Sequence, residues 1–294
     1  VTLELKYQPL RNNLGAALVQ AGRWEEAAAE YREVIRLEPE RAEMRSNLGD
    51  VLSRMGRDDE ALACFREALR RDPDCVQACN NLGIVLERRG DRAAARASYE
   101  AALRARPDYA EAHYNLANLL SRSGEVEEAI AHFREAIRLN PRYAPARNNL
   151  GNALAVQGKV AEAAEEYRKA LEADPDLLDA RNNLANLLAG AGRYDEAVVH
   201  YRKALEIDPN YGTAVLNLGY TLEVQGKLPE ALAEYRRALE LMPGSVPAHL
   251  RLAQALSALG KREEALSLVE KALALEPSSA AAKEAREKIA NSDQ

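Results

Sequence analysis

Leucine and small residues recur along the chain with a fixed period of 34 residues and no insertion. With residue 8 taken as position 1 of the first repeat, positions 7 and 11 hold leucine in all eight repeats, from Leu14 and Leu18 to Leu252 and Leu256. Residues four apart lie on one face of an α-helix, so the spacing predicts a first helix with a buried leucine face. Glycine at position 15 predicts the end of that helix, because glycine adopts a left-handed conformation at no steric cost.

A second helix is predicted in each repeat. Position 20 is always alanine, position 24 is aromatic except for Val269 in the last repeat, and position 28 is leucine or isoleucine. Position 8 of the first helix is only glycine or alanine, which indicates that the two helices cross closely there. Proline at position 32 stops the second helix. Pro9, Pro145, Pro247 and Pro229 fall in predicted first turns, where the missing N–H costs nothing.

This skeleton of leucine, small, aromatic and proline positions resembles the tetratricopeptide repeat, a 34-residue helix-turn-helix unit. The resemblance implies an all-α fold, a right-handed superhelical solenoid of eight such units whose first helices line the concave side. The expected repeats are 8–41, 42–75, 76–109, 110–143, 144–177, 178–211, 212–245 and 246–279. Residues 1–7 resemble the tail of an upstream repeat, and 280–294 are expected to form a C-terminal capping helix and tail.

Asparagine occupies position 6 in seven of the eight repeats, and Arg251 takes its place in the last. Asparagine costs roughly 0.5 kcal/mol or more relative to alanine inside a helix, so this row needs compensation. In one interpretation each carboxamide bonds a neighbouring helix and orients the stack. In the other it offers a donor and an acceptor to an extended peptide, which would meet an asparagine about every third residue. The predicted peptide-binding row is Asn13, Asn47, Asn81, Asn115, Asn149, Asn183 and Asn217.

Polar residues at positions 5 and 9 widen this row in the middle of the chain. The predicted contacts are Tyr114, Asn118, Asn148, Asn152, Asn182 and Asn186, with Tyr220 in the seventh repeat for an apolar side chain. The alternative for Leu216 and Tyr220 of the seventh repeat is that they fill space between repeats. The phrase Arg-Asn-Asn-Leu-Gly, or its Ala form, at residues 11–15, 147–151 and 181–185 resembles the repeat domain of O-linked N-acetylglucosamine transferase. That resemblance implies peptide binding by an asparagine ladder, without glycosyl transfer, because repeats fill the whole chain.

Composition narrows the classes of partner. The net charge is −6 and the basic residues are spread along the chain, so no nucleic-acid footprint stands out. No apolar run approaches the ~20 residues of a membrane helix, and no membrane partner is expected. Three cysteines do not form a disulfide framework, which favours a reducing, cytoplasmic location unless an export signal has been removed.

No residue pattern points to catalysis, a cofactor or a metal. The four histidines lack metal-ligand spacing within a repeat. A site built from Cys75, Cys79 and His113 is a remote alternative, because cysteine more often serves as a small buried hydrophobe. No phosphate-binding loop or nucleophile elbow occurs in the sequence. We therefore expect a non-catalytic module without a cofactor.

The sequence thus predicts a protein–protein interaction module that binds extended peptide segments in a concave, asparagine-lined groove. A carboxylate clamp for chaperone tails is disfavoured, because positions 2, 5 and 6 hold no lysine. The first alternative is a self-assembling or engineered scaffold whose exposed repeat ends stack head to tail. The second alternative is a substrate-recruiting domain excised from a glycosyltransferase.

Overall fold

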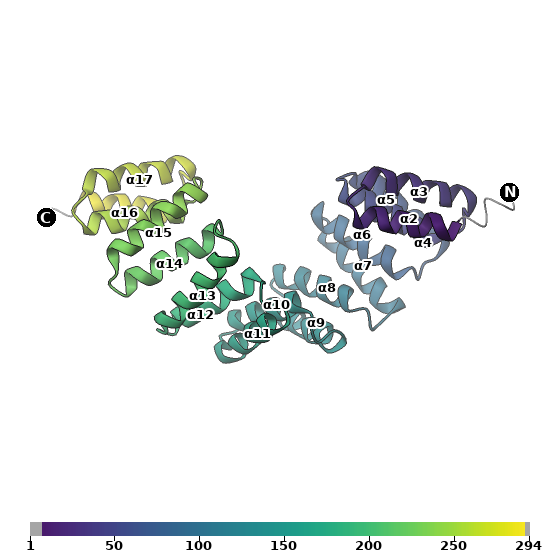
Figure 1. Cartoon of the computed structure of the whole chain (residues 1–294), viewed down its shortest axis with the longest axis horizontal. Helices are drawn as coiled ribbons and strands as arrows, with labels where there is room; N and C mark the ends of the chain where they lie inside the picture. Colours follow the sequence, from purple (N-terminus) through teal and green to yellow (C-terminus); the bar gives the residue numbers. More distant parts are fainter. Residues whose placement is uncertain (1–7, 292–294) are drawn as a thin grey trace. The chain divides into compact units, whose positions relative to one another are not determined.

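The computed structural model describes residues 8–291, and every regular element in that range is an α-helix (Figure 1). The first helices of the repeats are α2 (Gln8–Gln20), α4 (Ala42–Arg54), α6 (Val76–Arg88), α8 (Ala110–Arg122), α10 (Ala144–Val156), α12 (Leu178–Gly190), α14 (Gly212–Val224) and α16 (Val246–Ala258). The second helices are α3 (Trp24–Leu37), α5 (Asp58–Arg71), α7 (Arg92–Ala105), α9 (Val126–Leu139), α11 (Val160–Ala173), α13 (Tyr194–Ile207), α15 (Leu228–Leu241) and α17 (Arg262–Leu275). A last helix, α18 (Ala280–Ala290), packs on α16 and α17. The all-α architecture of helix pairs is confirmed, whereas the segment 1–7 lies outside the described residues.

The chain divides into two compact units, residues 1–153 and 154–294, with the boundary inside α10. Within the first unit, α4 packs on α5, and α6 packs on both α7 and the next first helix, α8. Within the second unit, α12 packs on α13 and also touches α14. Each unit is therefore built from the same two contacts, one inside a repeat and one between successive repeats.

In the first seven repeats position 24, which packs between the two helices, is an aromatic ring. A Cβ added to Gly83 would lie 2.5 Å from Cε1 of Tyr99, and one added to Gly49 would lie 2.6 Å from Cε1 of Phe65. The rings of Phe65 and Tyr99 are 0% and 1% exposed, so they have little room to move away. In these two repeats the ring leaves no room for a side chain at position 8. Alanine at position 20 is fully buried in all eight repeats.

The predicted leucine face is buried with two exceptions, Leu82 and Leu14. From the second repeat on, leucines at positions 7 and 11 are buried apart from Leu82, which is half-buried. Leu14 is 48% exposed, so the prediction of burial was wrong there. Within the described residues no repeat precedes Leu14.

Each first helix ends at the predicted glycine. All eight glycines at position 15 have positive φ, between 72° and 84°. In the third repeat, Gly90 N donates to Glu87 O at 2.9 Å and Asp91 N donates to Leu86 O at 3.0 Å. The left-handed residue thus lets two backbone N–H groups reach back and satisfy carbonyls at the helix end.

Replacing Gly90 with alanine should test this role. We expect Gly90→Ala to lower the free energy of unfolding by about 1–2 kcal/mol, because a Cβ is strained in the left-handed conformation. Gly244→Ala is the matched control, since Gly244 lacks a positive φ and nothing lies within 4 Å of its added Cβ. Urea unfolding followed by circular dichroism measures both, and equal losses in the two variants would contradict the assignment.

Positions 4 and 23 form a polar contact between the two helices of a repeat. Arg11 pairs with Glu30 at 2.8 Å in the first repeat, and in the fourth the Nδ1 atoms of His113 and His132 lie 2.8 Å apart. His113 Nε2 lies 3.0 Å from the Pro107 carbonyl. With both rings neutral, His113 therefore donates through Nε2 and accepts at Nδ1 from His132.

Burial and the neighbouring His113 lower the pKa of His132. In the sixth repeat, burial and the charge of Arg181 lower the pKa of His200. The unfolded chain then binds more protons than the folded chain below the ordinary histidine pKa of about 6.5. The stabilisation by these neutral rings is present above that pH and is lost as the pH falls toward their lowered pKa values.

We expect the urea midpoint to fall as the pH drops from about 7.5 to about 5.5. The double variant His132→Leu, His200→Leu should show a shallower fall, because it removes both groups that gain protons on unfolding. Leucine is accepted at this position in the last repeat, as Leu268. An unchanged slope in the double variant would show that other groups cause the pH dependence.

Candidate functional site

Positions 2, 6, 9 and 13 of the first helices share one face, which we call the groove face. None of these side chains is buried. In the first unit it comprises Asn13, Ala16, Gln20, Glu43, Asn47, Asp50, Arg54, Gln77, Asn81, Ile84, Arg88, Glu111, Asn115, Asn118, Arg122, Pro145, Asn149 and Asn152. In the second unit it comprises Val156, Asp179, Asn183, Asn186, Gly190, Thr213, Asn217, Tyr220, Val224, Pro247, Arg251, Gln254 and Ala258. The predicted residues at positions 6 and 9 all lie on this face.

Three asparagines at position 6, Asn115, Asn149 and Asn217, donate hydrogen bonds to the preceding repeat. Asn149 Nδ2 donates to Asn118 Oδ1 at 2.8 Å and to the Tyr114 hydroxyl at 3.4 Å. In the first unit, Asn115 Nδ2 also donates to Asn80 Oδ1 at 2.9 Å. The amide donors of this row are therefore used to hold successive first helices in register.

The same contact recurs in the second unit. Asn217 Nδ2 donates to Asn182 Oδ1 at 3.2 Å and to Asn186 Oδ1 at 3.0 Å. Asn186 Oδ1 also accepts from the Tyr201 hydroxyl at 2.5 Å. Its carboxamide is thereby fixed in orientation although the residue is exposed.

Position 5 lies beneath the groove face. Asn148 is 6% exposed and Asn182 is 5% exposed, so these two predicted contacts have little surface to offer a peptide. Asn148 Nδ2 donates to Asn149 Oδ1 at 3.0 Å. Tyr114 is half-buried, with its ring centroid 4.9 Å from that of Tyr143. Asn80 was not among the predicted contacts, although it also occupies position 5, and it is 4% exposed.

The position-6 asparagines of the first three repeats make fewer hydrogen bonds than those that follow. Within the described residues, Asn13 is exposed and Asn47 is half-buried, and neither makes a hydrogen bond. Asn81 Oδ1 accepts from Asn80 Nδ2 at 3.2 Å. The pattern of an asparagine bonded to the preceding repeat therefore begins at Asn115.

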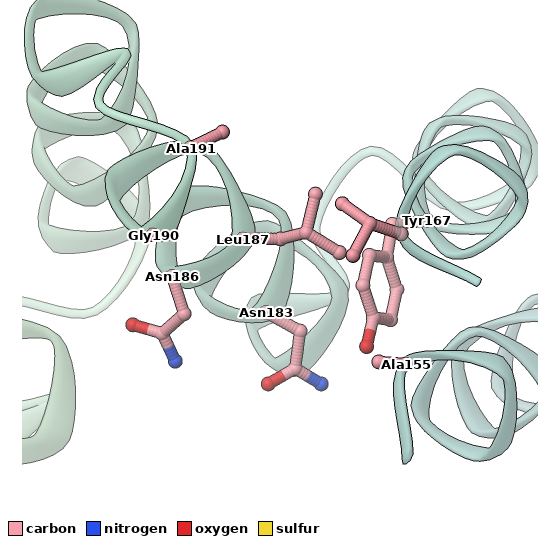
Figure 2. Close-up of a pocket in the computed structure, with 8 residues that line it drawn as sticks. Ala155, Tyr167, Asn183, Asn186, Leu187, Gly190 and Ala191 are labelled. Carbon is pink, nitrogen blue, oxygen red and sulfur yellow. The ribbon is translucent and has the colours of Figure 1, made fainter. Parts of the chain in front are cut away.

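A hollow of about 610 Å³ opens on the groove face of the second unit (Figure 2). It lies between α11 and α12, and Leu187 points across it toward Tyr167. The carboxamides of Asn183 and Asn186 project from the same helix beside it. The remaining lining residues are Ala155, Val160, Gly190 and Ala191. Burial raises the pKa of Tyr167 to about 12, so its hydroxyl stays neutral and the hollow is uncharged.

The equivalent hollow in the first unit is charged. It is lined by Ile84, Glu87, Arg88, Tyr99, Asn115, Asn118 and Arg122. Arg122 pairs with Glu87 at 2.5 Å across it, and the Tyr99 hydroxyl donates to Glu87 at 3.0 Å. The two hollows are lined by equivalent repeat positions, but one contains charged side chains and the other does not. The asparagines at position 6 alone do not reveal this difference.

The arginines on the groove face of the first unit are paired. Arg54 pairs with Asp50 at 2.9 Å, and Arg88 Nε donates to Asp58 at 3.0 Å. In the second unit the guanidinium of Arg251 lies 4.2 Å from the centroid of the Tyr220 ring. Within the described residues, no carboxylate lies within 4.0 Å of that guanidinium.

Models of the tetratricopeptide repeat match most of the chain. The matched segments are 12–74, 47–110, 80–144, 114–177, 178–211, 200–233 and 224–289. The chain is a tetratricopeptide-repeat protein. Tetratricopeptide repeats generally mediate protein–protein interaction and typically act as non-catalytic scaffolds. No curated protein matches the chain.

Solved structures share this repeat fold. The Cut9–Hcn1 hetero-tetramer of the APC/C is 16% identical with a TM-score of 0.71, over 90% of this chain and 52% of that chain, so this protein spans about half of that relative. YrrB, a tetratricopeptide-repeat protein with an unusual peptide-binding site, is 28% identical with a TM-score of 0.50, over 64% of this chain and 97% of YrrB. MamA is 30% identical with a TM-score of 0.51, over 55% of this chain and 95% of MamA. These structures add no support for the finer resemblance to the glycosyltransferase, which stays a prediction.

Within residues 8–291, no helix is both long and apolar enough to cross a bilayer. In the same range, no group of three or more His, Cys, Asp or Glu side chains is arranged to hold a metal ion. Cys79 Sγ lies 3.9 Å from the Pro73 carbonyl, while His113 contacts His132 and Pro107.

The bonds made by Asn217 predict a cost for its removal. We expect Asn217→Ala to lower the free energy of unfolding by about 1–3 kcal/mol. Two hydrogen bonds are lost, and the Oδ1 of buried Asn182 no longer receives the hydrogen bond from Asn217. Asn13→Ala should be neutral or slightly stabilising, since alanine is the better helix former and Asn13 bonds no described residue. Thermal and urea unfolding of both variants measure the difference. If Asn13→Ala cost as much as Asn217→Ala, the inter-repeat bonds would not be the cause.

Proposed function

We propose that this tetratricopeptide-repeat protein binds extended segments of partner proteins along its groove face and performs no chemistry of its own. The proposal rests on the hydrogen bonding of the carboxamides at position 6. Asn115 and Asn217 donate to the preceding repeat, but the Oδ1 of each accepts no hydrogen bond from the described residues. Both residues are half-exposed. Each therefore offers an oriented acceptor, the group that a peptide N–H needs.

Repetition supplies the spacing. Helices pack ~10 Å apart and an extended chain rises ~3.3 Å per residue, so an extended peptide passes one position-6 carboxamide about every third residue. At about 0.5–1.5 kcal/mol net per hydrogen bond, several bonds support a modest affinity that tolerates different sequences. The exposed carboxamides of Asn152 and Asn186 at position 9 add further polar contacts.

The proposed setting is a reducing one. Cys64, Cys75 and Cys79 are free thiols, and burial raises the pKa of the Cys79 thiol to about 11. A neutral, buried thiol is a poor nucleophile, so these cysteines are structural rather than reactive. This agrees with a cytoplasmic interaction module without an active site.

Binding of a library of extended, unstructured peptides tests the proposal. We expect Asn217→Ala to weaken binding several-fold, because it removes an acceptor from the groove face. Asn182→Ala is the matched control, since it breaks the same inter-repeat bond from beneath that face. Equal loss of binding in both variants would show that the bond, and not the acceptor, matters.

The same samples test the rival proposal of head-to-tail assembly. At the C-terminal end, α18 covers the last repeat and buries Ala282, Ala285 and Ile289. We therefore expect one mass by light scattering at all concentrations. A mass that grows with concentration would favour the scaffold, and absence of binding by any peptide would reject the groove.

A further inference from the structure

The open hollow of the second unit results from two small residues. At the junction of the third and fourth repeats, in the first unit, position 12 is Glu87 and position 13 of the next repeat is Arg122. Their ion pair crosses the hollow. At the matching junction of the second unit, these positions hold Ala155 and Gly190. Both side chains that fill the first hollow are thus truncated in the second.

The space left is suited to an apolar side chain. Tyr167, Leu187 and Val160 form its walls, and no charged residue lines it. Burying an aliphatic or aromatic side chain there removes apolar surface from water on both sides. The carboxamides of Asn183 and Asn186 project beside this hollow (Figure 2) and are able to bond a peptide backbone.

Arg251 is the second feature of this unit. It replaces asparagine at position 6, stacks on Tyr220, and has no carboxylate partner within the described residues. The other charged residue on the groove face of this unit, Asp179, accepts from the Tyr211 hydroxyl at 3.0 Å. A guanidinium with unused donors, held by an aromatic ring, is complementary to a carboxylate.

The partner chain can continue past Arg251. A second hollow of about 410 Å³ lies beside it, lined by Val246, Pro247, Leu250, Arg251, Gln254, Glu276, Ser279 and Ala281. Space on the far side of the guanidinium favours the carboxylate of an internal Asp or Glu over that of a chain terminus. Glu276 lines this hollow but is not within ion-pair distance of Arg251.

From these contacts we infer that the second unit selects extended segments with an aliphatic or aromatic residue in the Tyr167–Leu187 hollow and an acidic side chain on Arg251. The two anchors lie two repeats apart, ~20 Å, which corresponds to about six residues of extended chain. This inference rests on the proposed function and adds a specificity to it. The first unit lacks both features, since its hollow holds an ion pair and the arginines on its groove face are paired.

Fluorescence anisotropy with short acetylated and amidated Ser/Thr peptides tests the pair of anchors. One peptide carries Leu and Asp about six residues apart, in either order, and its matched forms replace Leu by Ser or Asp by Asn. We expect the full-length protein to bind the Leu/Asp peptide about tenfold more tightly than either matched form. The preference for Asp should weaken with added salt, and the preference for Leu should not.

Two protein variants assign each preference. Arg251→Asn restores the residue of the other seven repeats, and it should remove the preference for Asp while keeping that for Leu. The double variant Ala155→Glu, Gly190→Arg copies the ion pair of Glu87 and Arg122, and it should remove the preference for Leu while keeping that for Asp. Circular dichroism establishes that both variants fold.

The outcomes separate this inference from the proposed function. Equal affinity for all the peptides would overturn the anchors and leave peptide binding intact. No binding by these peptides or by the unbiased library would reject both. A peptide with a free C-terminus and no Asp that binds as tightly as the Leu/Asp peptide would assign Arg251 to a terminal carboxylate and overturn the choice of an acidic side chain.

Discussion

The fold depends on the packing of position 24, an aromatic ring in every repeat but the last, against the small residue at position 8 of the same repeat. Because Gly49 and Gly83 leave no space for a Cβ beside Phe65 and Tyr99, the two helices meet at a fixed depth and a fixed rotation. That rotation directs positions 2, 6, 9 and 13 to the open side of the first helix. The groove face, with its asparagines and hollows, is thus a consequence of how each helix pair closes.

Much of this could be predicted from the sequence, because the repeat period identifies residues that share a packing environment. The glycines at position 15 and the prolines in first turns were placed correctly, since both follow from backbone sterics alone. Leu14 was not, because its burial requires a neighbour that the described residues do not supply. The burial of Asn148 and Asn182 also escaped prediction. It depends on how one repeat rotates onto the next, which a period does not specify.

The two interpretations of the asparagine row are compatible once atoms are considered separately. A carboxamide carries two donors and one acceptor oxygen. In Asn217 the donors bond Asn182 and Asn186, which compensates for the poor helix propensity of asparagine and holds the repeats in register. The oxygen remains on the groove face in a fixed direction. Ordering a side chain before binding lowers the entropy lost when a ligand arrives, so the structural bond strengthens the case for the binding role.

The repeats share the residues that pack each helix pair. Specificity for a partner therefore depends on the few positions that differ from repeat to repeat. At positions 12 and 13, Glu87 and Arg122 satisfy each other across the junction, so a ligand would have to break an ion pair to enter. Ala155 and Gly190 present no such competition at the matching junction. The loss of two side chains that stabilise a repeat junction is therefore what makes the junction available to a partner. The same reasoning applies to Arg251, because no carboxylate of the described residues lies within ion-pair distance of its guanidinium.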